Sequence, residues 1–304
     1  MNCFNFLKIN FCSCHRSLLF ALLLFSSLAV HAQPFLWQVT GEHEFYMFGT
    51  IHLPDPRVTS LSEKVVQALE DSNVFYAELD LSEENTMLIK QSMWLPEGKN
   101  LYSFLPEELQ AKISKYIKEI NPELNLEFFS KQKIWVLAIT LTVLEQQLKY
   151  PGQPPLDTVL YERAVSLGLD TGGLETVDEQ LKVFDSMTSE QQIEFLNDTV
   201  DFMNSTMGNE QPFIEESLNA YIDGDLDVLM EHLMSYMKDN AFYDDLLDRL
   251  INQRNIKMAN KILNLISEEP EKKYFFAVGA GHFWGEKGIN TILEEKGYTI
   301  KSIE

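Results

Sequence analysis

The sequence has 304 residues but only three cysteines, and all three lie before Gln33. The rest of the chain therefore forms no disulfide bond and offers no thiolate to a metal. Any metal that it binds must be held by histidine or carboxylate groups. Histidine is scarce as well, because only four follow Ala32: His43, His52, His232 and His282.

Basic residues are few relative to acidic ones. Lysine and arginine number 24 against 46 aspartates and glutamates, which gives a net charge of −22. Such a surface repels the nucleic-acid backbone and anionic lipid, so we expect no nucleic-acid partner. We interpret the acidity as a contribution to solubility.

Long hydrophobic runs are missing beyond the N-terminus. The longest candidate, Ile134–Leu144, is too short to span a membrane comfortably, and it predicts a buried core helix. No linker rich in proline, glycine or serine divides the chain, so residues 33–304 are expected to form one domain.

The segment before Gln33 has the pattern of an export signal. Lys8 and Arg16 precede an apolar run, Leu18–Val30, and the small residue Ala32 precedes Gln33. This pattern predicts a signal peptide over residues 1–32, cleaved after Ala32. The mature protein would then be periplasmic or secreted, without stable membrane insertion. The long basic segment leaves an uncleaved N-terminal anchor open as the alternative.

Short aromatic and β-branched runs predict strands near both ends of the chain. The expected strands are Phe35–Thr40, Glu44–His52, Asn73–Leu79, Asp170–Glu175, Tyr274–Val278 and Tyr298–Ile303. Helical patterns cover Pro106–Leu148, Asp157–Leu167 and Thr176–Ile266, with breaks near Gly208, Gly224 and Asn240. This order predicts an α/β fold with a mixed central sheet, built from N- and C-terminal strands, and a large helical insertion.

Two of these strands end in the same pattern, G-x-x-H. Gly49 and His52 follow the second strand, and Gly279 and His282 follow the fifth. In open α/β sheets, ligands bind in the crevice beyond the carboxyl ends of the strands. If the strands are parallel neighbours, both imidazoles reach one site. Gly49, Gly279 and Gly281 would let a ligand approach the backbone closely.

Glu78 and Glu175 also stand at strand ends. Two imidazoles and one carboxylate form an open site for a divalent metal, so His52, Glu78 and His282 are the candidate metal ligands. The metal would acidify a bound water, and Glu175 would act as the general base or orient a ligand.

Each candidate also has a purely structural interpretation. His52 could be a hydrogen-bonded histidine near the core, and Glu78 could form a salt bridge with Arg254. Glu175 could favour the N-terminus of the helix that begins near Thr176. Arg254 itself could bind a substrate anion, a site carboxylate or a surface partner. His43 is expected in a turn.

Several segments together resemble the TraB/GumN family, which is related to the Tiki metalloproteases. These segments are MFGTIHLPD, VFYAELDL, LDTVLYERA, GLETVDEQLKVFD, RNIKMANKI and FFAVGAGHFWGEKGI. The similarity runs in the same order from Phe35 to the C-terminus. It implies an α/β fold with paired G-x-x-H motifs, and Phe283 departs mildly from the usual pattern.

The resemblance also implies roles. His52 and His282 match the paired histidines, Glu78 and Glu175 the motif glutamates, and Arg254 and Asn255 the late Arg-Asn pair. Tiki activity implies metal-dependent proteolysis with manganese or cobalt, and zinc is the third candidate.

The leading hypothesis from the sequence is an exported metal-dependent hydrolase, peptidase-like, acting on a peptide or small molecule. Whether the protein is an enzyme stays open. One alternative is a periplasmic binding protein that sequesters a peptide or a haem-like ligand without turnover. Another is an accessory protein of envelope polysaccharide biosynthesis.

Overall fold

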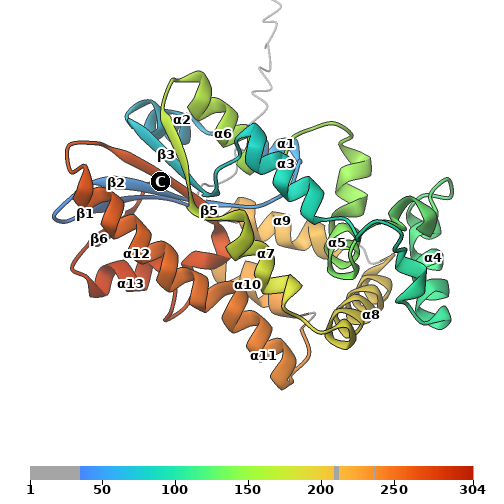
Figure 1. Ribbon diagram of the computed structural model, residues 1–304. Helices are drawn as coiled ribbons and strands as arrows, with labels where there is room; N and C mark the ends of the chain where they lie inside the picture. Colours follow the sequence, from blue (N-terminus) through green and yellow to red (C-terminus); the bar gives the residue numbers. More distant parts are fainter. Residues whose placement is uncertain (1–34, 209–211, 236, 304) are drawn as a thin grey trace, which may run out of the picture. The chain divides into compact units, whose positions relative to one another are not determined.

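The computed structural model describes residues 35–303 except 209–211 and 236. The predicted export signal, residues 1–32, lies outside these residues. The strands form one six-stranded sheet in the order β4-β3-β5-β2-β1-β6 (Figure 1). Their bounds are β1 Phe35–Thr40, β2 Phe45–Thr50, β3 Val74–Leu79, β4 Asp170–Glu175, β5 Tyr274–Gly279 and β6 Thr299–Ser302. The predicted α/β class with a mixed sheet is confirmed.

Four neighbouring strands of this sheet are parallel. β4 pairs with β3, β3 with β5, and β5 with β2, all in parallel, whereas β1 and β6 pair antiparallel at the other side. The central strand β5 comes nearly last in the sequence, yet it joins β2 and β3, which both come near the beginning. The carboxyl ends of the four parallel strands therefore meet at one edge.

Helices cover both faces of the sheet because β5 is apolar on both sides. Phe275 and Ala277 pack on one face against α2 (Glu63–Glu70), α6 (Leu156–Ser166) and α9 (Phe213–Asp223). Phe276 and Val278 pack on the other face against α12 (Gln253–Glu268) and α13 (Ile289–Glu295). The resulting arrangement is a sheet between two helical layers (Figure 1).

Most other helices share a separate hydrophobic core. They are α3 Glu83–Ser92, α4 Glu107–Ile120, α5 Ile134–Lys149, α7 Val177–Asp185, α8 Ser189–Thr206 and α11 Ala241–Leu247. The apolar run of α5 is buried in this core, as predicted. Across the part of the chain that the structure describes, no helix combines the length and apolar character needed to cross a membrane.

Two local predictions were wrong. The helix expected over Pro106–Leu148 is interrupted between α4 and α5, because Asn121 precedes a proline and adopts an extended conformation. The segment Thr176–Ile266 has an additional break before Thr188, whose capping box begins α8.

The loop after His52 contains a short helix, α1 (Pro56–Thr59), whose N-cap is Asp55. His282 lies within the 3-10 helix η4 (Ala280–Phe283), directly after β5. The remaining helix is α10 (Leu226–Ser235).

Candidate active site

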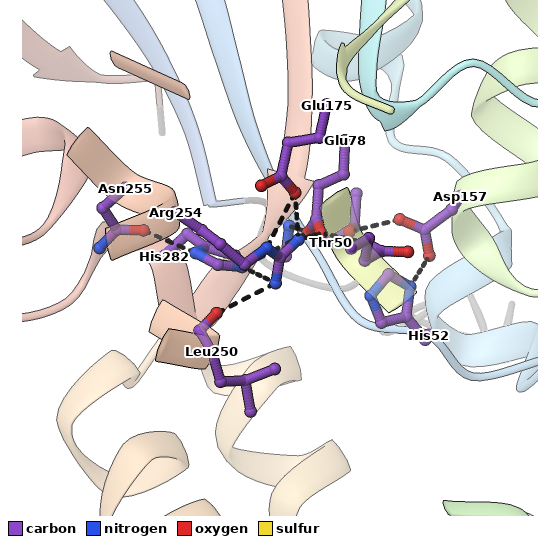
Figure 2. Close-up of polar contacts among 11 residues, drawn as sticks. Thr50, His52, Glu78, Asp157, Glu175, Leu250, Arg254, Asn255 and His282 are labelled. Carbon is purple, nitrogen blue, oxygen red and sulfur yellow. Dashed lines mark hydrogen bonds and ion pairs between the residues drawn. The ribbon is translucent and has the colours of Figure 1, made fainter. Parts of the chain in front are cut away.

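The parallel order of the strands brings the four predicted residues to one edge of the sheet. Going across the sheet, Glu175 ends β4, Glu78 lies near the end of β3, His282 follows β5 and His52 follows β2. Figure 2 shows Glu78, Glu175 and His282 around the guanidinium of Arg254, with His52 to one side next to Asp157. The premise of the sequence argument, that the strands are parallel neighbours, is confirmed.

Arg254 from α12 lies at the centre of the buried part of the site. Its Nε donates to Oε2 of Glu175 at 2.8 Å, and its Nη2 forms ion pairs with the same oxygen at 2.7 Å and with Oε2 of Glu78. Its Nη1 lies 3.2 Å from Nε2 of His282 and donates to the carbonyl oxygen of Leu250 at 3.0 Å. The salt bridge from Glu78 to Arg254 is therefore present, and it is buried with Arg254 only 6% exposed.

The backbone before Arg254 explains how this side chain is aimed. Residues Asp248–Asn252 form a π-helical turn between α11 and α12, and the Leu250 carbonyl in this turn accepts from Nη1. Such π turns inside helices occur frequently at functional sites. Arg249, in the same turn, instead contacts Asp245 and the carbonyl of Val183.

Glu78 is held on both carboxylate oxygens. Oε1 accepts from the backbone N–H of Gly279 at 2.7 Å, and Oε2 accepts from Gln180 Nε2 at 3.1 Å as well as from Arg254. Burial raises the pKa of Glu78, but its interactions with the His282 ring, the charge of Arg254 and the N–H of Gly279 outweigh burial and keep the pKa well below its usual value. Glu78 is therefore an oriented carboxylate anion.

Glu175 also meets Arg254 through Oε2, but it has neither the backbone N–H nor the glutamine amide that Glu78 accepts from. Burial raises the pKa of Glu175, and the hydrogen bond and charge of Arg254 offset this only in part. Two carboxyl groups that share one arginine thus have pKa values shifted in opposite directions, a pattern typical of groups with different acid–base roles. Glu175 does not cap α7, because Thr176 and Glu179 form that capping box.

His282 is buried and its tautomer is determined by its neighbours. Nδ1 lies 2.6 Å from Oδ1 of Asn255, whose Nδ2 donates to the carbonyl of Lys287 at 2.8 Å. Because the amide nitrogen is committed to Lys287, Oδ1 accepts the proton on Nδ1, and Nε2 carries the lone pair. Burial lowers the pKa of His282 to about 4, so the ring is neutral at neutral pH.

His52 has the opposite environment. Its side chain is 66% exposed, and its Nδ1 lies 2.6 Å from Oδ2 of Asp157 in α6. Thr50 donates to the other carboxylate oxygen of Asp157, also at 2.6 Å. The charge of Asp157 raises the pKa of His52 to about 9, against the effect of desolvation.

Gly279 lies where these groups approach one another. A Cβ at this position would stand 3.0 Å from Glu78 Oε1, 3.7 Å from His282 Cδ2 and 3.8 Å from His52 Nε2. Both histidines and Glu78 therefore border the same small volume, and the glycine keeps it open.

The other two glycines predicted to admit a ligand are packed against protein. A Cβ at Gly49 would meet Phe35 and Ala280, and one at Gly281 would meet the sulfur of Met230.

The candidate ligands fit a divalent ion in chemical type and in orientation. Both imidazoles have Nδ1 bound to an oxygen acceptor, which leaves Nε2 for a metal, and Glu78 supplies a carboxylate oxygen. As they stand, however, no three histidine, aspartate or glutamate side chains in the described ranges form a metal-binding group. Arg254 Nη1 would have to withdraw from His282 Nε2 for this nitrogen to bind an ion.

Three residues of the site were not singled out from the sequence: Asp157, Thr50 and Gln180. Asp157 and Gln180 occur in segments that carry the family resemblance, and each lies in the first turns of a helix that follows a break. Their partners lie in distant parts of the chain, so only the fold shows their roles.

The chain matches the TraB/PrgY/gumN family over residues 35–302, and it belongs to that family. It is similar to curated proteins named Metalloprotease TIKI1 from Danio rerio and Homo sapiens, with 28% identity to each over 88% of this chain. The match spans 62% and 61% of those two proteins. A Metalloprotease TIKI homolog from Nematostella vectensis is 28% identical over 89% of this chain and 67% of its own length. None of the solved structures matches the chain significantly.

Proposed function

We propose that the protein is a metal-dependent hydrolase that cleaves peptide bonds, as the names of its relatives indicate for them. The observation that carries this proposal is the paired arrangement of His52 and His282. Each imidazole presents Nε2 beside Glu78 while an oxygen acceptor holds its Nδ1. This arrangement is what metal-ligating histidines require from their neighbours.

His52, His282 and Glu78 would hold the ion, with manganese, cobalt and zinc as the candidates. When bound, a divalent ion supplies a Lewis acid for the scissile carbonyl and lowers the pKa of a water molecule. Glu78 is kept anionic by its three donors, so it suits the role of ligand rather than base.

Glu175 would accept or return the proton of the attacking water through Oε1, since Arg254 binds Oε2. Arg254 would hold both glutamates in place and offset part of their charge. Gly279 would leave space for the substrate carbonyl, since any Cβ there would point at Glu78.

We further propose that the protein acts outside the cytoplasm, in the periplasm or after secretion. This rests on the residue pattern of the segment before Gln33. N-terminal sequencing of the protein recovered from its native compartment would test it, and a chain that begins at Gln33 is the expected result.

The activity is tested with the purified protein, a peptide library and added Mn²⁺, Co²⁺ or Zn²⁺. We expect cleavage products in mass spectra with one of these ions and none with excess chelator. His52→Ala should lower both the bound metal and the cleavage, whereas His43→Ala, in the β1–β2 turn, is the matched control. Equal metal content in folded wild type and His52→Ala would contradict the proposal.

One observation favours a second candidate, a protein that binds its ligand without turnover. Arg254 already pairs with both buried carboxyl groups, Glu78 and Glu175, without an added ion. In the same experiment, retention of a peptide or of haem without any cleavage would support this candidate.

A further inference from the structure

We propose that Asp157 is a positioning residue that holds the ring of His52 so that Nε2, and not Nδ1, faces Glu78. This inference rests on the proposed function of His52 as a ligand. It concerns a residue of α6 that lies 105 positions further along the chain, in contact with the ring through Nδ1 at 2.6 Å.

The carboxylate of Asp157 is itself fixed. Its Oδ1 accepts from the hydroxyl of Thr50 at 2.6 Å, and Thr50 is buried at the end of β2. The backbone N–H of Leu156 donates to the carbonyl of Leu53, which joins the start of α6 to the loop that carries His52. The acceptor therefore belongs to the rigid part of the fold.

His52 needs such an anchor more than His282 does. The side chain of Asp157 is 16% exposed and that of His52 is 66% exposed, so packing alone restrains the His52 ring weakly. A ring with this freedom exchanges rotamers and would present either nitrogen to the site. The bond to Asp157 selects the Nδ1–H tautomer and points Nε2 towards Gly279, where a Cβ would lie 3.8 Å away.

The geometry around Thr50 predicts what an amide would do at this position. In Asp157→Asn, the hydroxyl of Thr50 still donates to the side-chain oxygen, so the NH₂ group turns towards His52. Nδ1 must then accept a hydrogen bond, and the proton moves to Nε2, the nitrogen that should bind the ligand. The variant replaces one carboxylate oxygen by an NH₂ group, and it thereby reverses the tautomer of His52.

A purely structural role must be separated from this one. Asp157 lies in the first turn of α6, where a negative charge also stabilises the helix. Asp244→Asn is the matched control, because Asp244 is an exposed aspartate in the first turn of α11. It should lower stability in the same way without any effect on His52.

The experiment uses the full chain labelled with ¹⁵N-histidine and free of metal. Two-bond ¹H–¹⁵N spectra, recorded above the pKa of His52, report its tautomer, and titration with Co²⁺ followed by visible absorption reports binding. We expect wild type and Asp244→Asn to show Nδ1–H, and Asp157→Asn to show Nε2–H with Co²⁺ affinity reduced by about 10- to 100-fold.

Thr50→Val is the second variant, and it keeps the carboxylate while removing its anchor. We expect the Nδ1–H tautomer with a Co²⁺ affinity between those of wild type and Asp157→Asn. Retention of Nδ1–H and of full Co²⁺ affinity in Asp157→Asn would overturn the inference. A reversed tautomer in a protein whose wild type does not bind Co²⁺ would instead contradict the proposed function and leave the positioning role intact.

Discussion

The two halves of the site hold their histidines by different means. On the inner side, His282 is buried, and a neutral amide, Asn255, accepts from it. On the outer side, His52 is exposed, and an aspartate, Asp157, accepts from it. The inner histidine stays neutral because burial disfavours its charge, and the outer one readily becomes charged because its partner is an anion.

This difference indicates that the two sides of the site have different roles. The inner side is a preorganised network in which Arg254 joins two glutamates and a histidine, so it resists change. The outer side depends on one hydrogen bond to a ring that solvent reaches. We therefore expect substitutions on the inner side to affect folding as well as the proposed binding and catalysis, and those on the outer side to affect the proposed binding and catalysis alone.

The largest effect is expected for Arg254→Ala. This change leaves Glu78 and Glu175 buried without a cation, which costs about 3–5 kcal/mol of unfolding free energy. Urea denaturation measures the loss. Arg163→Ala, which removes an exposed pair with Glu70, is the control and should cost less than about 1 kcal/mol. A similar small cost for both variants would show that the inner network is not preorganised.

Gly279→Ala should disturb the position where the inner and outer sides of the site approach each other. The backbone of Gly279 has φ of −51°, which alanine adopts easily, but the added methyl group would press on Glu78 Oε1. Displacement of the site by such a contact should lower the proposed peptidase activity by about 100-fold with little loss of stability. Gly281→Ala is the control, since its methyl group meets only the flexible end of Met230. Equal activity of the two variants would contradict the claim that both histidines and Glu78 border one volume beside Gly279.

Exchanging the amide and the carboxylate that accept from the two Nδ1 atoms should bring the pKa values of the two histidines closer together. In metal-free protein, Asn255→Asp should raise the pKa of His282 above about 4, and Asp157→Asn should lower the pKa of His52 below about 9. A neighbouring opposite charge shifts a pKa by about 1–3 units. NMR titration of the ring protons measures both shifts, and unchanged values would show that the acceptor does not cause the difference.

The smallest effect is expected at the loop behind His52. Arg57 joins Asp55 to Glu215 in α9. Its hydrogen bond lowers the pKa of Glu215, and for Asp55 its bonds outweigh the raising effect of burial on the pKa. Both folded-state pKa values lie below the unfolded ones, so this stabilisation is present above about pH 4 and is lost as pH falls further.

Arg57→Ala should therefore lower the unfolding free energy by about 1 kcal/mol at pH 7 and by less at pH 3. Denaturant unfolding at the two pH values measures the difference. Lys115→Ala, which removes an exposed pair with Glu119, is the control and should show no comparable dependence on pH.

The sequence alone identifies those site residues that are marked by the short pattern around them. The apolar run of β5 and the two G-x-x-H patterns identify strand ends, and strand ends locate His52 and His282. The ion pair between Glu78 and Arg254 is the structural alternative that the sequence offers beside a metal ligand, because a glutamate on an apolar strand needs a cation.

The remaining features depend on tertiary placement. The contact from Asp157 to His52 requires α6 to begin beside the loop after β2, which no periodicity encodes. The π turn that aims Arg254 adds one residue to a helical repeat, and sequence patterns do not distinguish it from an ordinary α-helix.

The position of β5 within the sheet has a consequence for biosynthesis. Because β5 pairs with both β2 and β3, these strands have no partner on their inner edges until residues 274–279 have been made. A growing chain would carry two open strand edges for nearly its whole synthesis, and open edges promote misassembly. Premature stop codons before this strand should therefore yield aggregates rather than stable fragments.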